Sequence, residues 1–263
     1  MESNAAISLC MLASGSRGNA IYLSDGDSRI LIDAGLSGVE IERRMSSRGL
    51  DPKQLNGIVV SHEHSDHIQA VGILSRRFKL PVYISEETYQ ASRRQLGRID
   101  DVRKFTCGTP FPIGSMVLHP FSIPHDAMDP AGFTVTSNGT RIGIATDLGI
   151  ATSMVKTHLK ECTALIIEAN HDRVMLAEGP YPWPLKQRIK SRTGHLSNED
   201  TLRLLKEILH GRLSHVILAH LSEQNNTPEK ALGAVGPALH HSGINLSVAV
   251  QDRCSKVFRI RGK

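Results

Sequence analysis

The chain has 263 residues, of which 40% are hydrophobic and 22% are charged, a composition typical of a globular protein. No apolar run reaches the roughly 18 residues that a membrane-spanning helix needs, so we expect no contact with a membrane. A net charge of +5 weakly favours a polyanionic partner. The length suits one or two units, and we expect a single domain over residues 1–263.

The N-terminus and the cysteines together predict a cytoplasmic location. The first four residues carry no basic region ahead of a short apolar stretch, which is not the pattern of a secretory signal. The cysteines are widely separated and form no C-x-x-C pair, so we expect reduced thiols; they are Cys10, Cys107, Cys162 and Cys254.

The first third of the chain alternates short apolar runs with turn residues. We expect strands at 7–12, 20–23 and 29–32, a loop at 14–19 and a helix at 37–48. A strand at 58–60 follows, then helices at 66–78 and 86–96 around a strand at 82–84. Residues 102–146 are expected to be mostly β. In the rest of the chain we expect buried strands at 164–167 and 216–219 and helices at 197–210 and 228–242. Two short strands near 246–250 and 257–260 are expected at the end.

Four metal-binding side chains cluster directly after the apolar run 58–60: His62, His64, Asp66 and His67. Imidazole nitrogens and a carboxylate oxygen suit zinc, manganese or iron(II). A helix would turn His62 and His64 about 200° apart, so they could not share a metal there. We therefore expect a strand that ends, a loop that carries the ligands, and a helix beginning near Asp66.

Three further candidates each follow a predicted strand. His125 comes after residues 121–124, Asp147 after the run 142–146, and His220 after the run 216–219. Taken alone, each is more often a turn or cap residue. Because a binuclear site needs ligands beyond the first cluster, we interpret all three as metal ligands.

The spacing His62-x-His64-x-Asp66-His67 resembles the H-x-H-x-D-H motif of the metallo-β-lactamase superfamily. The resemblance implies an α/β fold, a four-layer αβ/βα sandwich of two mixed β-sheets flanked by helices. It also implies two divalent cations, Zn²⁺ or Mn²⁺. The first would take His62, His64, His125 and Asp147, and the second would take Asp66, His67, Asp147 and His220. Asp33 matches the aspartate of the first family motif, which orients the ligand loop.

Two later segments resemble those that supply a catalytic pair in tRNase Z. They place Glu168 after residues 166–167 and His195 in the segment 194–198. The resemblance implies that Glu168 orients His195 and that His195 protonates the leaving oxygen, with Asp66 also in the catalytic set. Without this resemblance, an ion-pairing carboxylate would be an equally good interpretation of Glu168, and an exposed loop histidine would be an equally good interpretation of His195.

Strings along nearly the whole chain resemble the YycJ-like (WalJ-like) subgroup of the superfamily, among them 13–19, 32–37, 61–67, 194–198 and 219–226. Only 72 residues separate Asp147 from His220, which leaves no room for the large inserted domain of other nuclease branches. The resemblance implies a binuclear metal-dependent phosphodiesterase, a 5′-to-3′ exonuclease on DNA in preference to RNA. In it, a metal-bridging hydroxide attacks phosphorus.

Candidate substrate contacts follow from charge and position. The segment 181–192 carries a cation at every second position: Lys186, Arg188, Lys190 and Arg192. These side chains could neutralise phosphates, and Tyr181 or Trp183 could stack on a base. Alternatively, the segment is a solvated turn anchored by Trp183. Ser222, Asn225 and Asn226 could donate hydrogen bonds to a terminal phosphate or cap the next helix.

Two alternatives stand beside the nuclease. A small-molecule or cyclic phosphodiesterase would use the same ligands without a preference for a linear polymer. A non-catalytic module would keep the metals for structure, and removal of His195 would then change no activity. The ligand set accepts either zinc or manganese, and the sequence assigns no oligomeric state.

Overall fold

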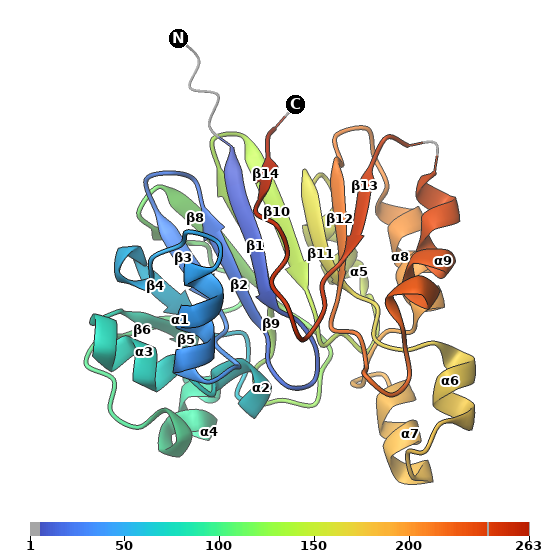
Figure 1. Ribbon diagram of the computed structural model, residues 1–263, viewed down its shortest axis with the longest axis horizontal. Helices are drawn as coiled ribbons and strands as arrows, with labels where there is room; N and C mark the ends of the chain where they lie inside the picture. Colours follow the sequence, from blue (N-terminus) through green and yellow to red (C-terminus); the bar gives the residue numbers. More distant parts are fainter. Residues whose placement is uncertain (1–5, 241, 263) are drawn as a thin grey trace.

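Two seven-stranded sheets face each other in the computed structural model, which describes residues 6–240 and 242–262 (Figure 1). The first sheet has the order β14 (Phe258–Ile260), β1 (Ile7–Ala13), β2 (Ala20–Ser24), β3 (Arg29–Ile32), β4 (Gly57–Val59), β5 (Val82–Ser85) and β6 (Val102–Phe105). The second has the order β13 (Asn245–Val248), β12 (His215–Ala219), β11 (Ala164–Glu168), β10 (Thr140–Ala145), β9 (Ala131–Ser137), β8 (Met116–Ser122) and β7 (Phe111–Ile113).

Helices cover the outer face of each sheet, so the chain builds four layers (Figure 1). The first sheet is covered by α1 (Gly38–Ser46), α3 (Val71–Phe78) and α4 (Glu86–Leu96), and the second by α5 (Ser153–Leu159), α8 (Asn198–Ile208) and α9 (Pro228–Leu239). One apolar cluster fills the space between the sheets, and a further cluster lies under each helical layer. This arrangement confirms the predicted αβ/βα sandwich.

The two sheets share one pattern of pairing. Read from β14 in the first sheet and from β7 in the second, three antiparallel pairings precede three parallel ones. Both sheets are therefore mixed, as expected. Parallel neighbours bring their carboxyl ends to one edge of a sheet, and the residues that follow those ends can meet there.

The expected helix over 66–78 is interrupted. A short α2 (Ser65–Ile68) is followed by a break at residues 69–70 before α3 begins. The break has a physical reason, because the backbone of Ala34 bonds into it. Ala34 N donates to His67 O at 2.7 Å, and Ala70 N donates to Ala34 O at 2.8 Å. The segment after β3 thus fixes the ligand loop in place.

Two helices extend beyond the second sheet, at the lower right of Figure 1: α6 (Arg173–Glu178) and α7 (Trp183–Lys190). The sequence did not predict them, because short helices with two prolines at 182 and 184 lack a long apolar periodicity. A 3₁₀ turn (Pro52–Gln54) completes the helical elements of residues 6–240 and 242–262.

Within the described residues, the helices are all too short or too polar to cross a lipid bilayer. The four cysteines are present as free thiols, and three of them are buried.

Candidate metal centre

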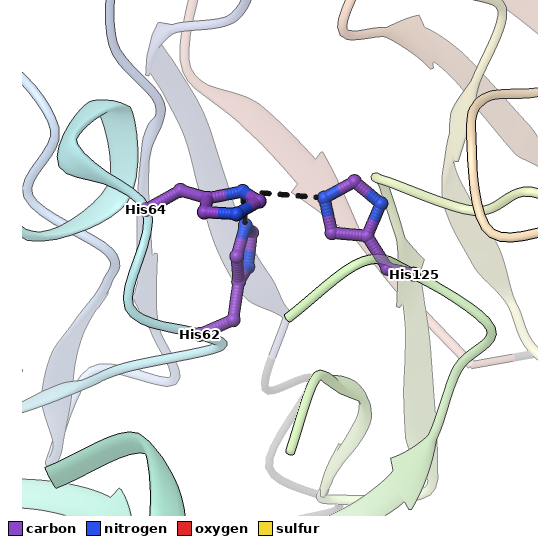
Figure 2. Close-up of side chains that lie close together, drawn as sticks. All are labelled: His62, His64 and His125. Atoms are coloured by element: carbon purple, nitrogen blue, oxygen red, sulfur yellow. Dashed lines mark hydrogen bonds between the residues drawn. The ribbon is translucent and has the colours of Figure 1, made fainter. Parts of the chain in front are cut away.

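Three histidines from two separate loops converge on one point (Figure 2). His62 Nε2 lies 3.1 Å from His64 Nδ1, and His125 Nε2 lies 3.3 Å from the same atom. Ligands about 2.0–2.1 Å from a tetrahedral zinc ion would lie roughly 3.3 Å from one another. The spacing of these nitrogen atoms therefore matches that of ligands on a single cation.

A second group of donor atoms lies beside the first. His67 Nε2 is 3.6 Å from Asp66 Oδ2, and His220 Nε2 is 3.8 Å from the same oxygen. His220 comes directly after β12, whereas Asp66 and His67 belong to α2. The two sheets thus contribute to one set of donors.

Asp147 lies between the two groups and reaches both. Its Oδ2 is 3.3 Å from His67 Nε2, and its Oδ1 is 3.5 Å from His220 Nε2 and 3.8 Å from His125 Nε2. The side chain is buried, and Oδ2 has no hydrogen-bond partner among the described residues. A carboxylate in this position can be shared by two cations.

The histidines are oriented by carboxylates and hydroxyls behind them. Asp33 Oδ2 lies 2.8 Å from His67 Nδ1 and accepts from Ser61 Oγ at 2.8 Å. Ser61 Oγ also contacts His62 Nδ1 at 3.0 Å. A partner at Nδ1 fixes the ring and leaves Nε2 as the donor toward the site. Asp33 therefore lies where it can orient the His67 ring.

Glu168 is the corresponding carboxylate on the second sheet. Its Oε1 accepts from His195 Nδ1 at 2.9 Å and from His220 Nδ1 at 2.8 Å. Its Oε2 accepts from the backbone N–H groups of Leu148 and Leu196, both at 2.9 Å. Because these donors occupy both oxygen atoms, Glu168 orients the two histidines and is unsuited to hold a cation itself.

Backbone conformation distinguishes three site residues. Asp33, Asp147 and His220 have φ values of 59°, 56° and 56°, in the left-handed region that side chains other than glycine rarely adopt. Such conformations persist only where surrounding contacts impose them, and they cluster at functional sites. For His220 one such contact is its N–H, which donates to Ser14 Oγ at 2.7 Å.

The electrostatics of the site suit a cation. Burial alone would raise the pKa of Asp147, but His220 and His67 outweigh it and hold that pKa well below its usual range. Burial alone would lower the pKa of His220, but Asp147, Asp66 and Glu168 raise it to about 10. Buried carboxylates that stay ionised demand a positive charge, and His220 Nε2 is a further buried atom without a hydrogen-bond partner among the described residues. The donors therefore fit divalent cations.

A cavity of about 280 Å³ opens over these donors. Its lining includes Asp66, Asp147 and His195 together with Tyr181 and Ser222. Asn225 is fully buried and Asn226 is 5% exposed, and Asn226 pairs with Asn198. Neither asparagine lines the cavity, so the geometry does not support the expected phosphate contact of Asn225.

The four predicted phosphate-binding cations do not form one patch. Lys186 donates to Ala177 O at 2.7 Å, and Arg188 Nε donates to Asp126 Oδ2 at 2.5 Å. Residues two apart on a helix face different directions. Arg188 therefore lines the metal cavity, whereas Lys190 lines a second, adjacent cavity. Arg192 is exposed and lines neither cavity.

Trp183 is 70% exposed at the start of α7, so it does not anchor this helix in the core.

Two asparagines that contact the donor residues were not predicted from the sequence. Asn19 Nδ2 lies 3.3 Å from Asp66 Oδ2 and 3.1 Å from His67 Nε2. Asn170 Nδ2 donates to His220 O at 3.0 Å. Their positions beside a glycine-rich loop and at the end of β11 were the available signals, but serines and asparagines are common in ordinary loops.

Comparison with known proteins shows the family to which the chain belongs. Residues 28–220 match the family model described as "Beta-lactamase superfamily domain". The chain is 36% identical over 243 residues to exodeoxyribonuclease YycJ of Bacillus anthracis, with 92% of each chain covered. It is 37% identical over 225 residues to exodeoxyribonuclease WalJ of Streptococcus pneumoniae, with 84% of each covered.

Among solved structures, the metallo-β-lactamase fold protein YhfI of Bacillus subtilis aligns with a TM-score of 0.73 at 14% identity, covering 95% of this chain and 99% of that one. At this identity the likeness concerns the fold alone. The chain belongs to the beta-lactamase superfamily. Within it, the near-full-length relatives reported above are the exodeoxyribonucleases YycJ and WalJ.

Proposed function

We propose that this chain is a metal-dependent nuclease that degrades DNA from a 5′ end. Its membership of the superfamily makes it a metal-dependent hydrolase. The similarity to YycJ and WalJ, which extends over most of each chain, supports DNA as the substrate. The observation that carries the proposal is the pairing of His195 with Glu168 at the rim of the metal centre, because a phosphodiester needs an acid for its leaving oxygen.

We assign the donors to two divalent cations, Zn²⁺ or Mn²⁺. His62, His64 and His125 would hold one, Asp66, His67 and His220 would hold the other, and Asp147 would be shared. When bound, two such cations supply activation of a water nucleophile and neutralisation of phosphate charge.

The contribution of His195 follows from its surroundings. Burial alone would lower its pKa, but the Glu168 carboxylate raises that pKa above the ordinary value, which favours the protonated form of the imidazole. Glu168 holds Nδ1 and leaves Nε2–H free to donate a proton to the oxygen that departs from phosphorus. The ring centroid of His195 lies 5.3 Å from that of His125 and 5.2 Å from that of His220, within reach of a bound ester.

Both sheets supply donors to the same centre, so dividing the chain would divide the site. This supports a single domain over residues 1–263. A cytoplasmic location is part of the proposal, and the free thiols are consistent with it.

The test uses end-labelled single- and double-stranded DNA and RNA, with protein stripped of metal and then resupplied with Mn²⁺ or Zn²⁺. We expect mononucleotide products from 5′-phosphorylated DNA only after resupply. Hydrolysis of bis(p-nitrophenyl) phosphate without degradation of any polymer would instead favour a small-molecule phosphodiesterase.

A further inference from the structure

A second cavity of about 520 Å³ lies next to the metal cavity. It opens between the segment after β10, including Gly149 and Ala151, and the face of α8 that carries Arg203 and Glu207. His195 lines both cavities. Ligand-binding pockets commonly have volumes of roughly 300–1,000 Å³, so this one can hold a group the size of a nucleotide.

A closely packed partition divides the two cavities where Gly149, which lines the second cavity, meets Gly194, which lines the metal cavity. A Cβ atom on Gly149 would lie 2.2 Å from Arg192 O, and one on Gly194 would lie 2.2 Å from Ile189 O. His195 N donates to Ile189 O at 2.9 Å, which ties the partition to the end of α7. The partition is therefore closely packed, and His195 stands at the boundary between the spaces.

The charge of the second cavity favours an anion. Four cations line it, Lys156, Arg173, Lys190 and Arg203, against the two carboxylates of Asp200 and Glu207. Asp200 is shared by Arg173 at 2.9 Å and Arg203 at 3.2 Å, Lys156 pairs with Glu207 at 2.7 Å, and Glu199 lies 3.5 Å from Arg173. Lys190 is exposed and has no ion-pair partner in the described part of the chain.

The lining also offers surfaces for a base or sugar. Ile150, Leu196 and Leu204 supply apolar contacts. His171 is 3% exposed, and its Nδ1 has no hydrogen-bond partner among the described residues. A buried imidazole nitrogen without a partner is costly and is relieved by a polar group of a ligand.

We propose that this cavity binds one nucleotide of the substrate, the nucleotide that carries the leaving oxygen. The inference rests on the proposed nuclease function. His195 would donate its proton at the boundary, and the nucleotide that departs would lie on the side of His195 away from the cations. Lys190 and Arg203 would hold its phosphate, and the apolar residues and His171 would contact its base or sugar.

The test compares Lys190→Glu with Lys206→Glu in metal-loaded protein. Lys206 is an exposed residue of α8 that does not line the cavity, so it controls for the change in net charge. Both sites are exposed, and both variants should fold. We expect KM for single-stranded DNA to rise roughly tenfold in Lys190→Glu, the scale of one lost charge-assisted contact, with kcat within about twofold. Lys206→Glu should match the wild type.

A binding measurement makes the inference independent of turnover. Calorimetric titration with deoxyadenosine 5′-monophosphate should give a Kd at least about tenfold weaker in Lys190→Glu than in Lys206→Glu. If the wild type degrades DNA while both variants retain its KM and Kd, the cavity assignment is wrong and the nuclease function stands. If the wild type degrades no DNA, the nuclease function fails, and the two Kd values alone decide whether the cavity binds nucleotides.

Discussion

Glu168 makes contacts that divide the histidines of the site into different roles. It holds His195 and His220 through Nδ1, yet His220 faces Asp147 and Asp66 whereas His195 stands at the cavity wall. Burial alone would raise the pKa of Glu168, but His195 and His220 lower it to about 2, so this carboxylate stays ionised. One buried charge thus serves both a candidate metal ligand and a candidate proton donor.

Replacement of His195 should separate these roles. We expect His195→Ala to lower kcat on DNA by about 10²–10⁴-fold, the usual contribution of a general acid. Metal content, measured by mass spectrometry of the dialysed protein, should stay at the wild-type value because His195 holds no cation. His210→Ala, a change at a partly exposed histidine just beyond the C-terminal end of α8, is the control. Unchanged kcat in His195→Ala would exclude the proposed acid.

The pH dependence of turnover should reveal the charge of Glu168. Because Glu168 raises the pKa of His195, the protonated acid persists to higher pH, and kcat should fall as pH rises through that raised value. Glu168→Gln removes the negative charge and lowers the pKa of His195 toward its ordinary range. The descending limb of kcat against pH should therefore move to lower pH. A limb that stays in place would show that another group titrates.

Elements with strong periodicity or clear caps were predictable from the sequence. The strand Arg29–Ile32 and the helix Glu86–Leu96 were predicted with the bounds that the structure has. Ser197 and Thr227 cap α8 and α9, each accepting from the N–H three residues on, and serine and threonine are common caps at such positions. The break before α3 could not be predicted, because it depends on Ala34, a residue distant in the sequence.

The site was predictable to the extent that its residues follow strands. His220 comes directly after β12, and Glu168 ends β11. The directions of the side chains on α7 could not be predicted in this way. Residues two apart share one face of a strand but lie on different faces of a helix. The second cavity was also beyond the sequence, since its lining comes from four separate segments.

Gly35, which follows β3, lies against the backbone of Asp66 in the loop that carries the candidate metal ligands. A substitution of Gly35 therefore tests whether this contact holds the loop in place. A Cβ atom there would lie 1.6 Å from Asp66 O, so Gly35→Ala must push the loop away from the end of β3. We expect a lower Tm, by several degrees, and weaker metal binding. Gly233→Ala in α9 is the matched control, because its Cβ meets nothing within 4 Å and alanine favours a helix by up to about 1 kcal/mol. Equal Tm values in the two variants would contradict the assigned contact.

At the scale of the whole molecule, the two sheets repeat one arrangement around the centre. Asp33 and Asp147 each follow the fourth strand of the shared pairing order, β3 and β10, and both have left-handed backbone. Asp33 orients a histidine, whereas Asp147 reaches the donors of both groups. The fold therefore supplies two equivalent positions, and only the one on the second sheet lies among the donors.

Cations that bind between the sheets should stabilise the whole fold. Binding to the native state alone raises stability by mass action, so Tm should increase with Mn²⁺ concentration after treatment with a chelator. Asp147→Asn should reduce this increase because it removes the shared charge. Scanning calorimetry at several Mn²⁺ concentrations measures both. A Tm independent of metal would mean that cations do not bridge the two sheets.

The central claim is that residues from both sheets hold a pair of cations. Anomalous diffraction from crystals grown with Mn²⁺ tests it most directly. We expect two peaks, one among His62, His64 and His125 and the other among Asp66, His67 and His220, with Asp147 contacting both. A single peak, or peaks that leave His220 and Asp147 without a bound ion, would contradict it.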